Sequence, residues 1–336
     1  MQVKKVQFSR QATAFYFDTS FSQLKKIVPQ KTTVLITDEH LVAAHPKLFK
    51  GWNVIVLKAG EEFKVQATVN SVIEQLIHMH ADRNWTLVGV GGGVVTDMTG
   101  YVASIFLRGI SFGFVPTTLL AMVDAAIGGK NGIDVGLYKN MVGTINQPRF
   151  LLYDVALLKS LPDSEWRNGF AEIIKHAAIL DNTMFKELES RDLSFYQKSK
   201  PALQKLVQRN AAIKAKVVKE DEFEKDKRRL LNFGHTLGHA VEKQYELMHG
   251  EAVAIGMIFA ARLSAEMLRF KAPDRLIELI DQYGLPITAG YNKQKVFDVL
   301  VSDKKREGEQ MNFILLEKIG KAVVKKIPLQ EIYKLI

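Results

Sequence analysis

Short apolar runs alternate with amphipathic stretches through the first half of the chain. Four of these runs have the length and composition of buried strands, at residues 33–37, 53–57, 85–90 and 111–115. Between the second and third runs, apolar side chains recur at helical spacing over residues 65–80. The order strand, helix, strand predicts an α/β nucleotide-binding domain with a mostly parallel sheet.

The pattern changes near residue 162, where long amphipathic segments replace the short apolar runs. Four of these segments predict helices, at residues 165–178, 201–220, 237–244 and 251–270. Residues 311–327 predict short strands around Gly320. We therefore expect two domains, an α/β domain at residues 1–154 and a mainly α-helical domain at residues 155–336.

Composition narrows the class of protein and the possible ligands. The 336 residues are 47% apolar and 24% charged, as in soluble globular proteins. Without cysteine, disulfides and thiolate ligands are excluded, and His, Asp and Glu remain as metal ligands. The N-terminus lacks the apolar run of a signal peptide, and Pro116 and Asp124 break the most apolar stretch. We expect no membrane span and a cytoplasmic protein.

The formal net charge of +10 is compatible with nucleic acid, an acidic membrane surface or anionic small molecules as partners. The basic residues are spread along the chain, and no helix-turn-helix or zinc finger is recognisable. Most of the lysines must simply solvate the surface. The distribution favours a phosphorylated small molecule over nucleic acid or membrane.

A glycine-rich segment follows the predicted strand at residues 85–90. Gly91, Gly92 and Gly93 precede a helix expected from about Met98, with Asp97 just before it. Glycines allow close approach to the backbone, and a helix N-terminus offers N–H groups to a pyrophosphate. The spacing is not G-x-G-x-x-G, and such clusters are often only tight turns. The loop alone therefore leaves dinucleotide binding open.

Three of the eight histidines lie close together in the second half of the chain. On a helix, His235 and His239 share a face, so they could bind a metal, or one could bind it and the other transfer protons. Helical histidines at this spacing are more often surface or core residues than ligands. Thr236, Leu237 and Gly238 separate the pair, so the His-Glu-x-x-His motif of zinc peptidases is absent.

Charged residues also occur within apolar sequence. Burying Asp124 or Lys130 unpaired costs several kcal/mol, so each must pair with the other or with a charged ligand, and we favour the ligand. Glu172 and Lys175 stand three residues apart in a helix with apolar flanks. This favours an inward-facing ion pair over a surface one, and Glu172 becomes a candidate third ligand beside two histidines.

Taken together, the motifs resemble those of the 3-dehydroquinate synthase family of sugar-phosphate cyclases over nearly the whole chain. The matching segments are Gly60-Glu61-x-x-Lys64, residues 91–97, Arg108-Gly109, residues 115–121, Val123-Asp124, residues 128–130, Lys139-Asn140, residues 169–175, 231–240 and 249–254, and Asp303-Lys304-Lys305. The chain departs from the usual pattern at His40, Thr96, Asn131, Asp134 and Ser160.

The resemblance implies a reaction in which 3-deoxy-D-arabino-heptulosonate 7-phosphate becomes 3-dehydroquinate and phosphate. This step of the shikimate pathway proceeds by transient oxidation with NAD, phosphate elimination, reduction, ring opening and intramolecular aldol closure. NAD is therefore recycled, and the net reaction is a carbon–oxygen lyase reaction. The resemblance also implies a divalent metal, zinc or cobalt, and a homodimer.

The same resemblance assigns roles to individual residues. The implied metal ligands are Glu172, His235 and His249. The implied catalytic and substrate-binding residues are His239, Glu224, Lys175, Asp124, Lys130, Asn140, Lys214, Arg228, Asn232, Arg108 and Lys304. In this set His239 and Glu224 transfer protons, and Arg108 acts across the dimer interface. The implied NAD-binding residues are Asp38, Glu61, Lys64, Gly92, Gly93, Val94, Asp97, Thr117, Thr118, Lys139, Leu157 and Ser160.

Three other functions are alternatives to the reaction that the resemblance implies. A sister cyclase using sedoheptulose 7-phosphate or glucose 6-phosphate shares the metal, NAD and the mechanism, but its substrate has no carboxylate for Lys214 and Arg228. A metal-dependent polyol dehydrogenase would release NADH and would not need so many cations. A basic binding protein would be retained on nucleic acid in a salt-sensitive way and would need no metal.

Overall fold

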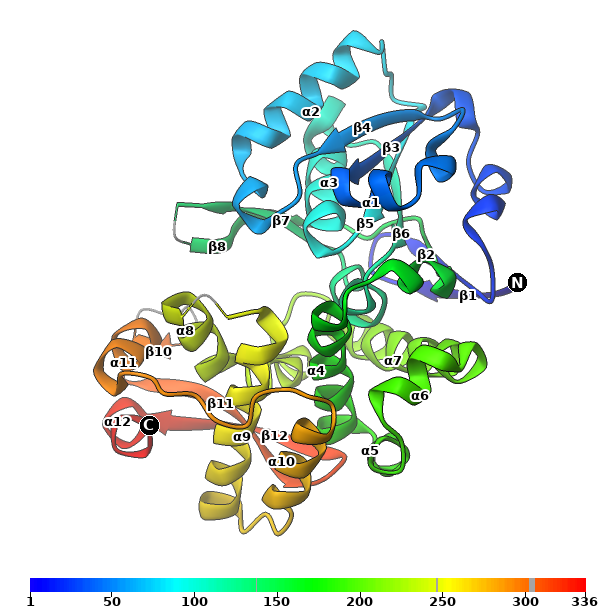
Figure 1. The fold of residues 1–336 in the computed structure, drawn as a ribbon. Coiled ribbons are helices and arrows are strands. Elements are labelled where there is room, and N and C mark those ends of the chain that lie inside the picture. The colour runs from blue at the N-terminus through cyan, green and yellow to red at the C-terminus, as the bar shows by residue number, and fades with distance from the viewer. Residues whose placement is uncertain (137, 246, 302–305) are drawn as a thin grey trace. The chain divides into compact units, whose positions relative to one another are not determined.

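The computed structural model describes residues 1–136, 138–245, 247–301 and 306–336 (Figure 1). The chain forms two compact units. Unit 1 consists of Met1–Pro162 and Lys200–Glu222, and unit 2 consists of Asp163–Ser199 and Phe223–Ile336.

Unit 1 is built on a seven-stranded sheet with the order β1-β2-β9-β6-β5-β3-β4. Its strands are β1 (Gln2–Gln7), β2 (Ala12–Phe17), β3 (Thr33–Asp38), β4 (Asn53–Leu57), β5 (Thr86–Gly91), β6 (Ser111–Pro116) and β9 (Phe150–Leu152). All neighbours pair in parallel except β1, which is antiparallel to β2. The central strands β3, β5 and β6 are buried along nearly their whole length, as expected where both faces are covered. The predicted mostly parallel α/β architecture is confirmed.

Helices and a hairpin complete unit 1. The α-helices are α1 (Glu39–Ala44), α2 (Gln66–His78), α3 (Gly93–Ile105) and α7 (Lys200–Glu220). The shorter helical turns are η1 (Phe21–Lys26), η2 (Gln30–Thr32), η3 (Pro46–Phe49), η4 (Glu61–Phe63), η5 (Phe106–Arg108), η6 (Ala121–Ala125) and η7 (Val155–Ser160). Strands β7 (Lys130–Val135) and β8 (Tyr138–Ile145) pair as a separate antiparallel hairpin.

The glycine-rich segment differs from the prediction. The helix expected from about Met98 begins five residues earlier, because α3 starts at Gly93 with Gly92 as its N-cap. Glycine is a poor residue for a helix interior but is accepted at the N-cap, where it costs little. Since β5 ends at Gly91, strand and helix are joined almost directly, and the N–H groups of the first helical turn lie at the end of the strand.

The division into units also differs from the predicted boundary between residues 154 and 155. Helix α7 was expected in the helical domain but belongs to unit 1. Its Lys214 Nζ lies 2.8 Å from Asp124 Oδ2, and its Gln208 donates a hydrogen bond to Gln2 at 2.7 Å. Amphipathic spacing predicts that a helix has a buried face, but it does not identify the surface that covers it.

Unit 2 is mainly helical, as predicted. Its helices are α4 (Asp163–Leu180), α5 (Asn182–Glu189), α6 (Leu193–Lys198), η8 (Lys227–Asn232), α8 (His235–Tyr245), α9 (His249–Leu268), α10 (Pro273–Gln282), α11 (Lys293–Val301) and α12 (Leu329–Leu335). Strands β10 (Arg306–Glu307), β11 (Gln310–Lys318) and β12 (Lys321–Pro328) form an antiparallel sheet. The turn between β11 and β12 contains Gly320 at φ +83°, where the sequence predicted strands around a glycine.

Helix α9 is central to unit 2. It is buried along most of its length and packs against α8, α4, α10 and β11 (Figure 1). Among the described helices, none combines the length and hydropathy that a bilayer crossing requires.

Candidate active-site residues in each unit

Three helices of unit 2 bring Glu172, His235 and His249 together. Glu172 lies within α4, while His235 and His249 are the first residues of α8 and α9. One ligand atom from each side chain lies within 4.8 Å of the other two. Nε2 of His235 and Nε2 of His249 face the same oxygen, Glu172 Oε1, at 3.4 and 3.2 Å. The two imidazoles and the carboxylate therefore converge on one point.

Two glycines of α9 allow the three helices to approach this closely. The N–H of Gly250 donates a hydrogen bond to Asn168 Oδ1 of α4 at 2.7 Å, and a Cβ on Gly250 would stand 2.7 Å from the Asn168 Cα. A Cβ on Gly256 would stand only 1.8 Å from the carbonyl oxygen of Gly234, directly before α8. Small residues at both contacts thus place the start of α9 beside Glu172 and beside His235.

The donor set fits a divalent metal ion. One carboxylate and two imidazoles without thiolate are a common three-ligand set for catalytic zinc, which keeps a further position for water or substrate. Glu172 is fully buried and His235 nearly so, while the His249 side chain is 29% exposed. Two of the three side chains are therefore enclosed by the protein, and His249 is the most exposed of them.

Burial and neighbouring charges shift the pKa values of the three side chains in different directions. Lys175 forms an ion pair with Glu172, as the sequence predicted for an inward-facing pair. Burial would raise the pKa of Glu172, but Lys175 and His235 hold it well below its ordinary value. Burial and the Lys175 cation lower the pKa of His235 to about 4, so His235 is neutral at neutral pH. Burial opposes protonation of His249 also, yet the carboxylates of Glu172 and Glu242 beside its ring raise its pKa to about 9.

These pKa values predict a pH dependence of metal affinity. Below about pH 9, a metal ion must displace one proton from His249, so zinc affinity should fall by about tenfold per pH unit towards acid. The stability of the metal-free protein has the opposite pH dependence, because the pKa of His249 is higher in the folded chain than in the unfolded chain. The resulting stabilisation is complete below about pH 6.5 and is lost as the pH rises through about 9. Competition with a zinc chelator at about pH 6, 7 and 8 measures the first effect. An affinity that is constant over this range would contradict it.

Four other predicted residues of unit 2 lie on α8 or in the segment that precedes it, at positions 224, 228, 232 and 239. His239 stands one turn after His235 on α8, and the two rings are 5.2 Å apart between centroids. Asn232 donates a hydrogen bond to Glu224 Oε1 at 2.7 Å, which places two of the predicted polar residues in contact. Arg228 is buried on η8, the turn that ends at Asn232. Lys304 lies outside the described residues, as do its neighbours Asp303 and Lys305.

In unit 1, the buried Lys64 joins several predicted residues that are themselves partly or fully exposed. Its Nζ lies 2.8 Å from Asp97 Oδ2 on α3, 2.8 Å from Asn140 Oδ1 on β8 and 3.5 Å from Glu61 Oε1. Burial alone would lower the pKa of Lys64, but Asp97 and Glu61 raise it above its ordinary value. The N–H of Asn140 donates to Asp134 Oδ1 at 2.7 Å, so the departure at Asp134 fixes the hairpin locally.

The end of β5 and the end of β6 lie side by side, and both carry predicted residues. Thr117 N–H donates to the Gly91 carbonyl at 3.0 Å. A Cβ on Gly92 would stand 3.0 Å from Thr118 Cγ2, so a larger residue would crowd this contact. Gly93 and Val94 form the first turn of α3 and are partly exposed. This geometry suits a phosphate group, because a helix N-terminus offers free N–H donors.

Asp124 and Lys130 differ from their expected environments. Asp124 is half-buried and pairs with Lys214 at 2.8 Å, a partner that the sequence analysis did not consider for it. Lys130 is exposed rather than buried, because the apolar stretch ends at Gly129 and Lys130 is the exposed first residue of β7. The lysine can therefore reach solvent.

The remaining predicted residues of unit 1 lie in or next to several different elements. Asp38 is the N-cap of α1 and accepts from the Leu41 N–H at 2.9 Å, while Leu157 lies in the hydrophobic core. Ser160 Oγ lies 2.7 Å from His45 Nε2. Lys139 and Arg108 are exposed, and Arg108 has a positive φ of 66°. Ser160 Oγ also donates a hydrogen bond to the Leu157 carbonyl oxygen at 3.3 Å.

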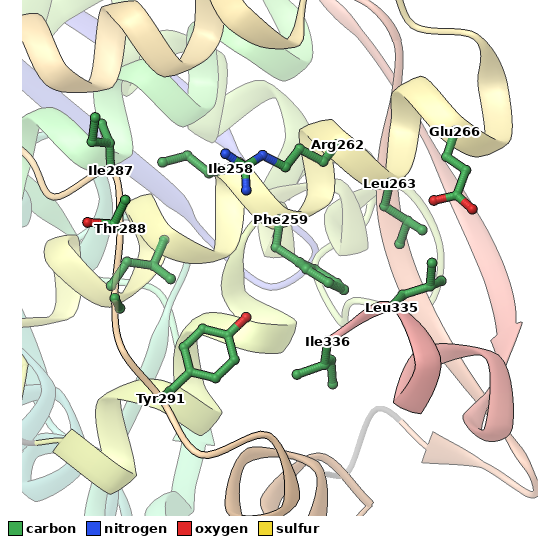
Figure 2. A pocket seen from close by; sticks show the side chains of 12 residues that line it. Ile258, Phe259, Arg262, Leu263, Glu266, Ile287, Thr288, Tyr291, Leu335 and Ile336 are labelled. Atoms are coloured by element: carbon green, nitrogen blue, oxygen red, sulfur yellow. The ribbon is translucent and has the colours of Figure 1, made fainter.

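Unit 2 also contains a pocket of about 330 Å³, lined on one side by side chains of α9 between residues 255 and 266 (Figure 2). Phe259, Leu263, Tyr291 and the C-terminal Ile336 line it together with Arg262. Of the residues predicted to act in catalysis or cofactor binding, those that the structure describes do not contribute to it.

The sequence analysis missed Glu242 and Asn168. Glu242 Oε2 lies 3.5 Å from His249 Nδ1, and Asn168 holds the first turn of α9. Glu242 could have been found from its spacing, because it follows His235 by seven residues and shares its helix face. Asn168 has no such signal, since its partner Gly250 is distant in sequence.

Comparisons with known proteins agree with this arrangement. Residues 54–168 match the family 3-dehydroquinate synthase N-terminal, and residues 169–306 match 3-dehydroquinate synthase C-terminal. A 3-dehydroquinate synthase of Acetivibrio thermocellus is 38% identical over 326 residues, which cover 92% of this chain and 91% of that protein.

Two examples illustrate the solved structures that share the fold. A 2-deoxy-scyllo-inosose synthase, complexed with carbaglucose-6-phosphate, NAD+ and Co2+, has a TM-score of 0.86 at 26% identity and covers 99% of both chains. ValA, a 2-epi-5-epi-valiolone synthase from Streptomyces hygroscopicus subsp. jinggangensis 5008 with NAD+ and Zn2+ bound, has a TM-score of 0.87 at 24% identity, covering 100% of this chain and 97% of its own. The second likeness concerns the fold alone. The two family models together match residues 54–306, and the Acetivibrio relative is 38% identical over 92% of this chain. The chain therefore belongs to the 3-dehydroquinate synthase family.

Proposed function

We propose that this protein converts 3-deoxy-D-arabino-heptulosonate 7-phosphate to 3-dehydroquinate and phosphate, as a carbon–oxygen lyase of aromatic amino acid biosynthesis. The observation that carries the proposal is the 38% identity to a 3-dehydroquinate synthase over nine-tenths of both chains. The convergence of Glu172, His235 and His249 supports it, because these are the metal ligands that the resemblance to the family implies.

NAD and a divalent metal, Zn2+ or Co2+, are the proposed cofactors. When bound, NAD supplies a reversible hydride acceptor and the metal supplies positive charge that polarises a substrate oxygen. Glu172, His235 and His249 hold the metal, while the first turn of α3 and the side chains of Glu61, Lys64 and Asp97 bind NAD. The NAD-binding roles of Asp38, Leu157, Ser160 and Lys139 remain predictions.

The protein's own side chains hold the substrate and move its protons. His239 and Glu224 are the proposed proton-transfer groups, and the contact of Glu224 with Asn232 orients its carboxylate. Lys175 contributes a buried positive charge beside Glu172.

Arg228 is suited to binding the substrate's carboxylate, since a guanidinium can donate two parallel hydrogen bonds to it. Lys214, Lys130 and Lys304 are the proposed partners of the phosphate and carboxylate.

A sister sugar-phosphate cyclase is the second candidate, since a solved relative at 26% identity is a 2-deoxy-scyllo-inosose synthase. The heptulosonate carries a carboxylate that sedoheptulose 7-phosphate and glucose 6-phosphate lack. Phosphate release from these three substrates, measured with metal and NAD present, separates the candidates. We expect release from the heptulosonate alone. Faster release from sedoheptulose 7-phosphate would transfer the protein to the sister cyclases.

The remaining parts of the proposal concern assembly and location. We propose a homodimer in the cytoplasm, with Arg108 acting across the subunit interface. The exposure of Arg108 is compatible with this role. A monomeric mass at micromolar concentration, measured by light scattering, would contradict the dimer.

A further inference from the structure

His249 faces a carboxylate with each of its two ring nitrogens. Nε2 lies 3.2 Å from Glu172 Oε1, and Nδ1 lies 3.5 Å from Glu242 Oε2. Glu242 belongs to α8, two turns after His235 and on the same face, and its side chain is only 10% exposed. The Glu242 carboxylate is thus held beside the His249 ring and away from most of the solvent.

The other candidate histidine ligand has a similar environment with a different acceptor. His235 Nε2 faces Glu172 Oε1 at 3.4 Å, and its Nδ1 lies 3.1 Å from the carbonyl oxygen of Phe233. Both rings therefore direct Nε2 to the same point and Nδ1 to an oxygen. A metal-binding imidazole uses the lone pair of one nitrogen, and the proton on the other needs an acceptor. The backbone meets this need for His235, whereas His249 depends on a side chain.

We propose that Glu242 is a positioning residue of the metal centre. It accepts a hydrogen bond from His249 Nδ1–H and so selects the tautomer and ring orientation in which Nε2 can bind a metal. The 3.5 Å separation is long for a hydrogen bond, and a small rotation of either side chain brings it into range. This inference rests on the proposed function, because it takes Glu172, His235 and His249 as the ligands.

A different role for Glu242 is possible in principle. Ligand atoms of His239, Glu242 and His249 also lie within 4.8 Å of one another, so they could hold an ion themselves. His249 would then have to serve two ions at once or leave Glu172 and His235. The orientation of Nε2 towards Glu172 favours a single ion with Glu242 as the acceptor.

The test is a Co2+ titration of the full-length metal-free protein, followed by chelator competition and by the visible absorption of bound cobalt. Glu242→Gln keeps the shape and removes the charge, and Glu242→Ala removes the acceptor. We expect one Co2+ per wild-type chain, an affinity about 10- to 100-fold weaker in both variants, and a changed visible spectrum. Glu266→Gln, an exposed carboxylate on α9, is the matched control and should bind cobalt as the wild type does.

The possible outcomes separate the inference from the proposed function. Equal cobalt affinity and an unchanged spectrum in both Glu242 variants would overturn the positioning role and leave the metal centre intact. Two ions per wild-type chain, with one lost in Glu242→Ala, would overturn it in favour of Glu242 as a ligand. A wild-type protein that binds no cobalt would instead remove the metal centre of the proposed function, and the inference with it.

Discussion

Glu172→Ala should abolish metal binding at micromolar metal and lower the free energy of unfolding of the metal-free protein by about 3–5 kcal/mol. Metal binding is lost because the carboxylate is the point on which His235 and His249 converge. Stability is lost because Lys175, 1% exposed, would remain as a buried charge without its Glu172 partner. Zinc titration and urea unfolding measure the two effects separately.

A double variant distinguishes these two causes. Glu172→Leu combined with Lys175→Met replaces the buried ion pair by apolar side chains of similar volume. Such replacements are often neutral or stabilising, so most of the lost stability should return, whereas metal binding should not. Glu317→Gln serves as the control, since its ion pair with Lys321 is at the surface and its loss should cost less than about 1 kcal/mol. A Glu172→Ala protein with wild-type zinc affinity would refute the assigned ligand set.

Gly256→Ala should destabilise unit 2 by at least about 2 kcal/mol and weaken metal binding. Alanine normally improves a helix by about 1 kcal/mol relative to glycine, so the expected sign is the reverse of helix propensity. The reason is the new Cβ, which would stand 1.8 Å from the Gly234 carbonyl oxygen. Both groups are attached to the backbone, so α8 and α9 must move apart, and His235 moves with the start of α8.

The control for this variant is Gly290→Ala, because no heavy atom lies within 4 Å of the position its Cβ would occupy. Its free energy of unfolding should remain within about 0.5 kcal/mol of the wild type. Thermal and urea unfolding of the two variants, with zinc affinity as a second readout, test the close approach of α8 and α9. A Gly256→Ala protein more stable than the wild type would show that the two helices separate at little cost.

The sequence predicted four strands of the unit 1 sheet, β3, β4, β5 and β6, because each is rich in apolar and β-branched residues. Strand β9 was missed although it is fully buried, because three residues are too short a run to stand out as a strand. Strand β1 was missed because it is exposed at nearly every position. Strand β2 carried a usable signal, since its buried residues Thr13, Phe15 and Phe17 alternate with more exposed ones. The hairpin β7–β8 was missed because most of β8 is exposed and has no apolar face.

The candidate site was predictable to the extent that its residues carry local patterns. His235, His239 and His249 lie within one short segment, and the apolar flanks of Glu172 and Lys175 marked an inward-facing pair. The contacts that assemble these residues depend on pairs distant in sequence, such as Asn168 with Gly250 and Asp124 with Lys214. Helix periodicity does not specify such pairs, so they required the structure.

Product formation with limiting NAD tests the central claim most directly. Metal-loaded protein is given 3-deoxy-D-arabino-heptulosonate 7-phosphate in large excess over NAD, and 3-dehydroquinate, phosphate and NADH are followed together. A 3-dehydroquinate synthase should form 3-dehydroquinate and phosphate in equal amounts, over many turnovers per NAD and without accumulating NADH. A reaction that stops after one equivalent of NAD, with NADH formed in step with substrate loss, would contradict the claim and indicate a dehydrogenase.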